Sequence, residues 1–80
     1  MKDTISIADA TKATGFTPRQ LRSYEAKGYI SKPVKITCGE IHYRRYTAQH
    51  IEEILRFKSF LEQGYTLAAA SEKAKKGGQN

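Results

Sequence analysis

The spacing of apolar residues near the N-terminus predicts two short helices joined by a tight turn. The first covers about residues 7–13, with Ser6 as its N-cap and Gly15 at its end. The second covers about residues 18–27 and starts with Thr17-Pro18-Arg19-Gln20. In that segment the threonine caps, the proline takes the first helical position and the glutamine completes a capping box. Two short helices with a glycine between them are typical of a helix-turn-helix.

A different period follows, in which apolar and polar residues alternate as they do in a strand. It predicts a two-stranded hairpin over about residues 34–46, with its turn at Cys38-Gly39-Glu40. Because an isolated hairpin is barely stable in water, one of its faces should pack on the helices. Residues 4–6 are also predicted to be extended. On the hairpin, Val34, Ile36, Ile41 and Tyr43 alternate with Lys35, Thr37, His42 and Arg44.

The last part of the chain returns to helical spacing. Thr47 is predicted to cap a helix of about residues 48–63, and Thr66 to cap an alanine-rich helix that runs to about Lys76. The chain is therefore predicted to be mainly α, with four helices and one two-stranded β wing. The core-facing positions of the third helix are Ile51, Ile54, Leu55, Leu61 and the stem of Lys58, with Phe57 and Phe60 alongside.

The second helix has one side that must face the core. Leu21 is its only large aliphatic side chain, so the stripe that it shares with Tyr24 or Glu25 is expected to be inside. The opposite face then presents Arg19, Arg22 and Ser23 to solvent. In a helix-turn-helix protein this face lies in the major groove of DNA.

The charge of the chain points in the same direction. The 80 residues suffice for one domain. Within it, residues 17–46 contain seven Lys and Arg, two Glu and four of the five tyrosines. Guanidinium groups match phosphate oxygens and phenols add neutral donors, although a solvated basic surface is the ordinary explanation of such an excess. No apolar run approaches a membrane span, and the single cysteine fits a reducing cytoplasm.

Three segments together resemble the DNA-binding domain of the mercury-resistance regulator (MerR) family. Residues 5–30, ISIADATKATGFTPRQLRSYEAKGYI, resemble its opening, with Leu-Arg, Tyr-Glu and a following Gly in the expected order. YRRYT at 43–47 resembles its wing exit, and EQGYTL at 62–67 resembles the turn between its third and fourth helices. The match covers about residues 5–70. The resemblance implies a four-helix winged helix-turn-helix that binds promoter DNA.

The resemblance also implies an organisation and partners. We expect a DNA-binding domain at residues 1–76 with a flexible tail at 77–80, binding double-stranded DNA and RNA polymerase in the cytoplasm at the nucleoid. Family members dimerise through a long helix after the fourth; this chain ends before it, so a monomer or weak dimer is expected. The DNA contacts carried over are Arg19, Arg22, Ser23, Tyr24, Tyr43, Arg44 and Arg45. Thr66 joins them because a helix start offers N–H groups to phosphate, with simple capping as the alternative.

Several of these residues have competing explanations. Arg22 could pair with Glu25 three residues later, and Tyr24 could serve the core alone. Arg44 and Arg45 should point to opposite faces of their strand, Arg44 to the polar face and Arg45 across the face expected to pack on the helices. At least one of the two should reach a phosphate or the minor groove, and the pattern leaves open which.

The chain departs from the family pattern at two places besides its length. Ser23 stands where the family usually has an aromatic residue, so one contact to DNA is lost or shortened. Glu40-Ile41-His42 precedes the wing tyrosine, where the family usually has a glycine, which changes the geometry of the wing tip.

Other chemistry finds little support in the sequence. Cys38, His42 and His50 are of mixed type on a turn and a helix start, without the paired motif of a zinc site. Glu52 and Glu53 point about 100° apart on a helix, so they do not form a carboxylate dyad. With no nucleophile–base pair and no phosphate loop, we expect no enzyme and no cofactor. The alternatives to a regulator are an excisionase-like DNA-bending factor and an antirepressor-type protein-interaction module.

Overall fold

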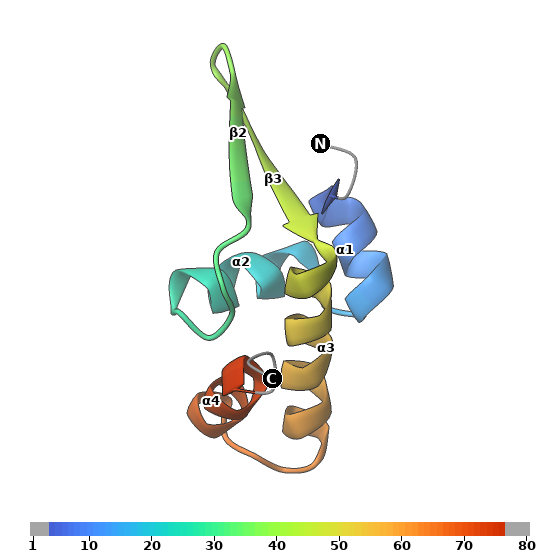
Figure 1. The fold of residues 1–80 in the computed structure, drawn as a ribbon, viewed down its shortest axis with the longest axis vertical. Coiled ribbons are helices and arrows are strands. Elements are labelled where there is room, and N and C mark those ends of the chain that lie inside the picture. The colour runs from blue at the N-terminus through green and yellow to red at the C-terminus, as the bar shows by residue number, and fades with distance from the viewer. Residues whose placement is uncertain (1–3, 77–80) are drawn as a thin grey trace.

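The computed structural model describes residues 4–76, except for the side chains of Cys38, Ile41, His42 and Tyr43. It has four helices and a hairpin that extends away from them (Figure 1). The mainly helical fold predicted from the sequence is confirmed, and the predicted tail at 77–80 lies outside the described residues. In chain order the elements are β1 (Thr4–Ile5), α1 (Ile7–Thr14), α2 (Pro18–Ala26), β2 (Val34–Cys38), β3 (Ile41–Thr47), α3 (Ala48–Glu62) and α4 (Leu67–Lys76).

The sheet has one strand more than the sequence predicted. The β2–β3 hairpin, called the wing below, was expected to be two-stranded, but β1 pairs antiparallel with β3 and gives the order β1-β3-β2. Thr4 lies opposite Thr47 and Ile5 opposite Tyr46. Two residues are too few to show an alternating pattern, so their pairing with a strand some 40 residues later leaves no local signal.

The helix starts follow the predicted capping chemistry. Thr17 Oγ1 accepts a hydrogen bond from Gln20 N at 3.1 Å, and Gln20 Oε1 accepts one from Thr17 N at 2.9 Å, so the capping box of α2 is confirmed. Thr47 caps α3, and here a second box forms because His50 Nδ1 accepts from Thr47 N at 3.1 Å. Each box satisfies two backbone donors that a helix start leaves unpaired, which fixes where α2 and α3 begin.

The turn between α1 and α2 is fastened from α3. Gly15 ends α1 at a φ of +83°, a conformation that side chains other than glycine rarely adopt. Lys58 Nζ donates a hydrogen bond to Thr14 O at 2.9 Å and lies 5.9 Å from the centre of the Phe16 ring. A Cβ at position 15 would collide with this ammonium group. The stem of Lys58, which was predicted to lie on the core side of its helix, thus carries its ammonium group to the turn between α1 and α2.

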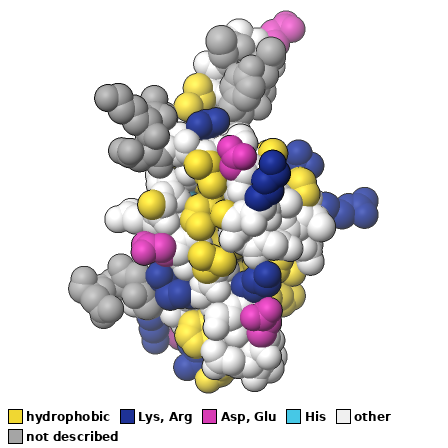
Figure 2. All heavy atoms as spheres, turned by 90° about the vertical axis from the view of Figure 1, so that its right-hand side faces the viewer, with side chains coloured by type: hydrophobic (Ala, Val, Ile, Leu, Met, Phe, Trp, Pro, Cys, Tyr) yellow, Lys and Arg dark blue, Asp and Glu magenta, His cyan; other side chains and the backbone are white. Residues whose placement is uncertain are grey.

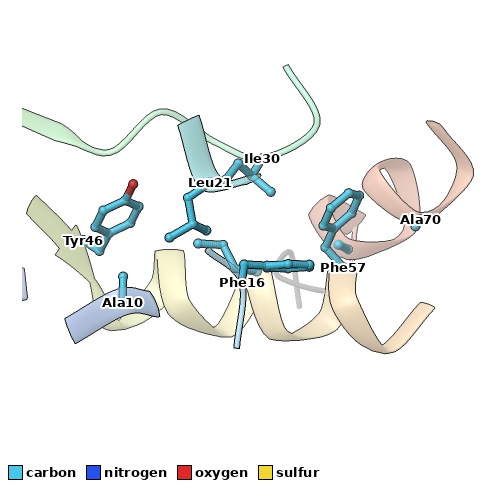
Figure 3. Packing of buried hydrophobic residues seen from close by; sticks show 9 residues of the cluster. Ala10, Phe16, Leu21, Ile30, Tyr46, Phe57 and Ala70 are labelled. Atoms are coloured by element: carbon cyan, nitrogen blue, oxygen red, sulfur yellow. The ribbon is translucent and has the colours of Figure 1, made fainter. Parts of the chain in front are cut away.

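The core runs along the inner side of α3 (Figure 3). Tyr46 lies at the end nearest the sheet, Leu21 in the middle, and Phe57 and Ala70 toward α4. Leu21 is completely buried, as its place on α2 predicted. The buried apolar side chains of the described residues are Ala10, Phe16, Leu21, Ile30, Tyr46, Ile54, Phe57, Ala70 and Ala74.

One predicted core position of α3 was wrong. Leu55 is 43% exposed, whereas Phe57 is fully buried. Successive residues of a helix turn by about 100°, so Ile54 and Phe57 can share the inner face while Leu55 is carried to its edge. The helix has more apolar residues than its inner face can bury, and the ring of Phe57 lies at the centre of that face.

Tyr46 is buried without a hydrogen bond. It is 1% exposed, and its hydroxyl has no partner among the described residues. Burial raises the pKa of the Tyr46 hydroxyl, because the phenolate would lose its hydration; nearby Arg44 acts in the opposite direction and Glu25 in the same one. The folded state therefore binds the phenolic proton more tightly than the unfolded chain does.

We expect Tyr46→Phe to be at least as stable as the parent at pH 7, by up to about 1 kcal/mol, because it removes an unpaired buried hydroxyl. Above about pH 10, where a free tyrosine ionises, the parent should lose free energy of unfolding, and the variant should lose less. Urea denaturation at pH 7 and pH 10.5 measures both effects. The half-exposed Tyr65→Phe is the matched control and should change neither value. A clear destabilisation of Tyr46→Phe at pH 7 would show that the hydroxyl is paired.

Candidate nucleic-acid interface

The outer face of α2 carries two unpaired cations. Because Leu21 is fully buried, Arg19 and Arg22 lie on the opposite side, and both are exposed. Among residues 4–76 neither forms an ion pair or a hydrogen bond to another side chain. Ser23, four residues after Arg19, shares this face and is half-buried. These arginines are therefore available to an external anion.

The competing explanation for Arg22, an ion pair with Glu25, does not hold in the structure. Glu25 is 6% exposed and turns toward the wing instead. Its Oε1 accepts a hydrogen bond from Arg44 Nε at 3.0 Å, and Lys35 Nζ lies 3.8 Å from its Oε2. The carboxylate that could have neutralised Arg22 is thus occupied by two cations of the wing.

Tyr24 belongs to an aromatic cluster. Its ring meets Phe16 edge-on at 5.3 Å between centroids and Phe57 edge-on at 5.2 Å, and Tyr29 lies 6.3 Å away. Such edge-to-face contacts stabilise the helix pair beyond the burial of area alone. Tyr24 as a whole is half-buried, so its ring packs on the core while the residue lies at the edge of the outer face of α2.

The two wing arginines point to opposite faces, as expected, but the faces are exchanged. Arg44 contacts Glu25 and shares its side of β3 with the buried Tyr46, so this is the side that packs on the helices. Arg45 lies on the other side, where its Nε donates to Thr4 Oγ1 at 3.1 Å and its Nη2 to Thr4 O at 2.8 Å. The prediction that Arg45 crosses the core-facing side was wrong, because Arg45 donates its hydrogen bonds to Thr4 of the additional strand β1.

The remaining predicted contacts lie away from α2. Thr66 is exposed, and its Oγ1 accepts a hydrogen bond from Ala69 N at 3.2 Å, so it caps α4. The turn before α4 lies at the opposite end of the molecule from the wing tip (Figure 1). The side chain of Tyr43 is outside the described residues. Within the described part of the chain no three His, Cys, Asp or Glu side chains lie together as metal ligands would.

Sequence reasoning left open whether Tyr24 or Glu25 shares the inner stripe with Leu21, and it missed the contacts of Glu25 with the wing. A signal was present, because Glu25 follows the buried Leu21 by four residues and so shares its stripe on the helix. A carboxylate on an inner stripe needs a counter-charge, and the wing offered Lys35 and Arg44. What could not be foreseen was which cation would come near, since that depends on how the wing packs.

Comparison with known proteins settles the family. A family model described as MerR HTH family regulatory protein matches residues 5–76. The chain belongs to the MerR family. The resemblance noted in the sequence is thereby confirmed over nearly the whole described chain. None of the described helices is long and apolar enough to cross a membrane.

Several similar proteins carry the name HTH-type transcriptional regulator CueR. The protein of Yersinia pestis is 40% identical over 63 residues, and that of Escherichia coli O6:H1 (strain CFT073) is 34% identical over 68 residues. These alignments cover 79% and 85% of this chain but only 43% and 48% of the relatives. The chain thus spans less than half the length of these MerR-family relatives.

Charge alone does not mark the interface on this MerR-family domain. Figure 2 shows the side of the molecule on which α1 lies, where hydrophobic atoms run down the middle and Lys and Arg side chains lie on both sides of them. Arg19 and Arg22 stand out because they lie together on the face of α2 turned away from Leu21 and have no internal partner among the described residues. By contrast, Lys58, Arg56 and Lys75 each donate a hydrogen bond to a backbone carbonyl.

We expect the arginines of α2 and of the wing to differ in their effect on stability. Arg22→Ala should change the free energy of unfolding by less than about 0.5 kcal/mol, as exposed residues without partners do. Arg44→Ala should lower it by about 1–3 kcal/mol, because the buried Glu25 would keep only the longer contact with Lys35. Chemical denaturation of both variants measures the difference, and equal effects would contradict the assignment of Arg44 to an internal ion pair.

Proposed function

We propose that this chain is the DNA-binding part of a transcriptional regulator and that it recognises a specific double-stranded sequence through α2. The observation that carries the proposal is the pair of exposed, internally unpaired arginines on the face of α2 opposite the buried Leu21. A helix of this kind fits the major groove, where guanidinium groups donate to guanine O6 and N7 or to phosphates. Membership of the MerR family supports it.

The shape of the domain supports additional contacts on both sides of α2. Its longest dimension is 41 Å, which exceeds the roughly 34 Å of one turn of B-DNA. The wing and the turn before α4 lie at opposite ends of this long axis, with α2 between them (Figure 1). We propose that the wing, through Arg44 and Tyr43, contacts the flanking backbone or minor groove, and that the N-terminus of α4 at Thr66 receives a phosphate.

The names of the relatives favour a role at promoters. The similar proteins are named transcriptional regulators, which supports regulation over DNA bending beside a recombinase or docking of an acidic protein. We propose promoter DNA as the main partner and RNA polymerase as a further one, in the cytoplasm at the nucleoid.

We expect the affinity for DNA to fall steeply with salt. If about six phosphates are neutralised, the logarithm of the binding constant should fall against the logarithm of salt concentration with a slope of about −5. The probe is a 30-bp duplex that the chain itself has selected from a random-sequence library, and fluorescence anisotropy gives the affinity between 50 and 300 mM KCl. Failure to select or bind any duplex at the lowest salt would overturn the proposed function.

The same duplex tests the role of Arg22. If Arg22 reads a base, Arg22→Ala should weaken binding by about 1–3 kcal/mol, relax the preference at one position and leave the salt slope unchanged. If it binds a phosphate, affinity should fall equally for all duplexes and the slope should lose about one unit. Lys76→Ala is the matched control, since it removes one cation whose partner is the exposed Glu72. Binding of Arg22→Ala equal to that of the parent would reject this placement of α2.

A further inference from the structure

A buried carboxylate joins α2 to the base of the wing. Glu25 lies in the last turn of α2, and its side chain is 7% exposed. It contacts Arg44 at 3.0 Å and Lys35 at 3.8 Å. Lys35 and Arg44 lie directly opposite each other on β2 and β3. One side chain of α2 therefore contacts both strands of the wing.

Few backbone positions of the wing lie close to α2. β3 packs chiefly on β2, β1, α3 and α1, while contacts between α2 and the two wing strands are few. The wing thus leaves the body of the domain from a base held by α1 and α3. Among the described residues, the ion pairs of Glu25 connect the two parts of the proposed DNA-binding surface by charge, beside the apolar core that holds both Leu21 of α2 and Tyr46 of β3.

An ion pair in such a place is better suited to fixing geometry than to adding stability. Removing a carboxylate from water costs free energy that its pairing returns only in part. The acceptable arrangements are few, because the carboxylate is confined by burial and must stay near both cations. Arg44 donates through Nε, and its side chain is 31% exposed, so the contact with Glu25 holds the stem of Arg44 while the side chain still reaches the surface.

We propose that Glu25 is a positioning residue that sets the direction of the wing relative to α2 and thereby the preference of the domain for one DNA sequence over others. The inference rests on the DNA-binding function proposed above. With the carboxylate in place, a duplex must fit α2 and a wing of fixed direction at the same time. Without it, the wing can adapt to the backbone of any duplex, and Arg44 and Lys35 face no internal anion.

The first test compares the selected 30-bp duplex with a scrambled duplex of the same composition. Glu25→Gln keeps the shape of the side chain and removes its charge. We expect it to weaken binding to the selected duplex about tenfold, a loss comparable to that of one side-chain contact with a base, while binding to the scrambled duplex stays equal or becomes tighter. The exposed Glu72→Gln makes the same change of charge outside this surface and should leave the ratio of the two affinities unchanged.

This ratio separates positioning from a general loss of structure. A variant that is partly unfolded binds both duplexes more weakly by the same factor, so the ratio survives. Both proteins are measured below their melting temperatures, which circular dichroism determines. If Glu25→Gln weakens both duplexes equally, or neither, Glu25 does not set selectivity and the proposal is overturned.

The second test uses no DNA. Backbone N–H residual dipolar couplings of the full 80-residue chain report the direction of the wing relative to the helices. In Glu25→Gln the couplings of residues 34–47 should no longer fit the orientation found in the parent, while those of α1, α3 and α4 should fit unchanged. Arg44→Gln breaks the same ion pair from the other side, and it should show the same change if Glu25→Gln does not fold.

The two tests distinguish the failure of each proposal. If the parent binds no duplex, the proposed function fails, and the couplings still decide whether Glu25 directs the wing. If the parent binds DNA but the couplings of Glu25→Gln and Arg44→Gln match those of the parent, the positioning role fails and the proposed function stands.

Discussion

The burial of Leu21 is the constraint on which the proposed DNA-binding surface depends. α2 has nine residues and one large aliphatic side chain, so its rotation about its own axis is set largely by where that side chain goes. Leu21 is completely buried in the core that also holds Ile54 and Phe57. Everything on the opposite side of α2 is consequently turned to solvent, including both arginines. A rotation by one residue would bury a guanidinium group, which is far more costly than exposing a leucine.

The same rotation that exposes Arg22 also buries Glu25, and this couples the two halves of the surface. A carboxylate on the inner stripe of α2 must find cations, and the nearest belong to the wing. The arginines of α2 and the cations at the wing base therefore have different roles. Those of α2 are free because their local acidic neighbour is engaged elsewhere, and those at the wing base are held because they engage it.

The sequence predicted what local chemistry determines and missed what depends on packing. The starts of α2 and α3 lie where Thr17 and Thr47 cap them, because a capping residue acts on the backbone within three residues of itself. The pairing of β1 with β3 and the contact of Glu25 with Arg44 join residues far apart in the chain, and neither leaves a periodic pattern. Leu55 was misplaced for a related reason, since α3 has more apolar residues than its inner face can bury.

In the proposed function, the short side chain at position 23 makes the direction of the wing important for selectivity. The resembling sequences usually carry an aromatic residue there, and Ser23 reaches less far from the helix. Because α2 then has two long side chains, Arg19 and Arg22, on its outer face, a larger share of the contacts that distinguish one duplex from another must come from elsewhere. Wing contacts contribute to selectivity only if the wing meets the duplex at a defined angle, since a mobile wing follows any backbone equally well. A short residue on α2 and a buried ion pair behind it are thus consistent with the proposed arrangement, in which two elements share the recognition of DNA and the buried ion pair fixes their relative direction.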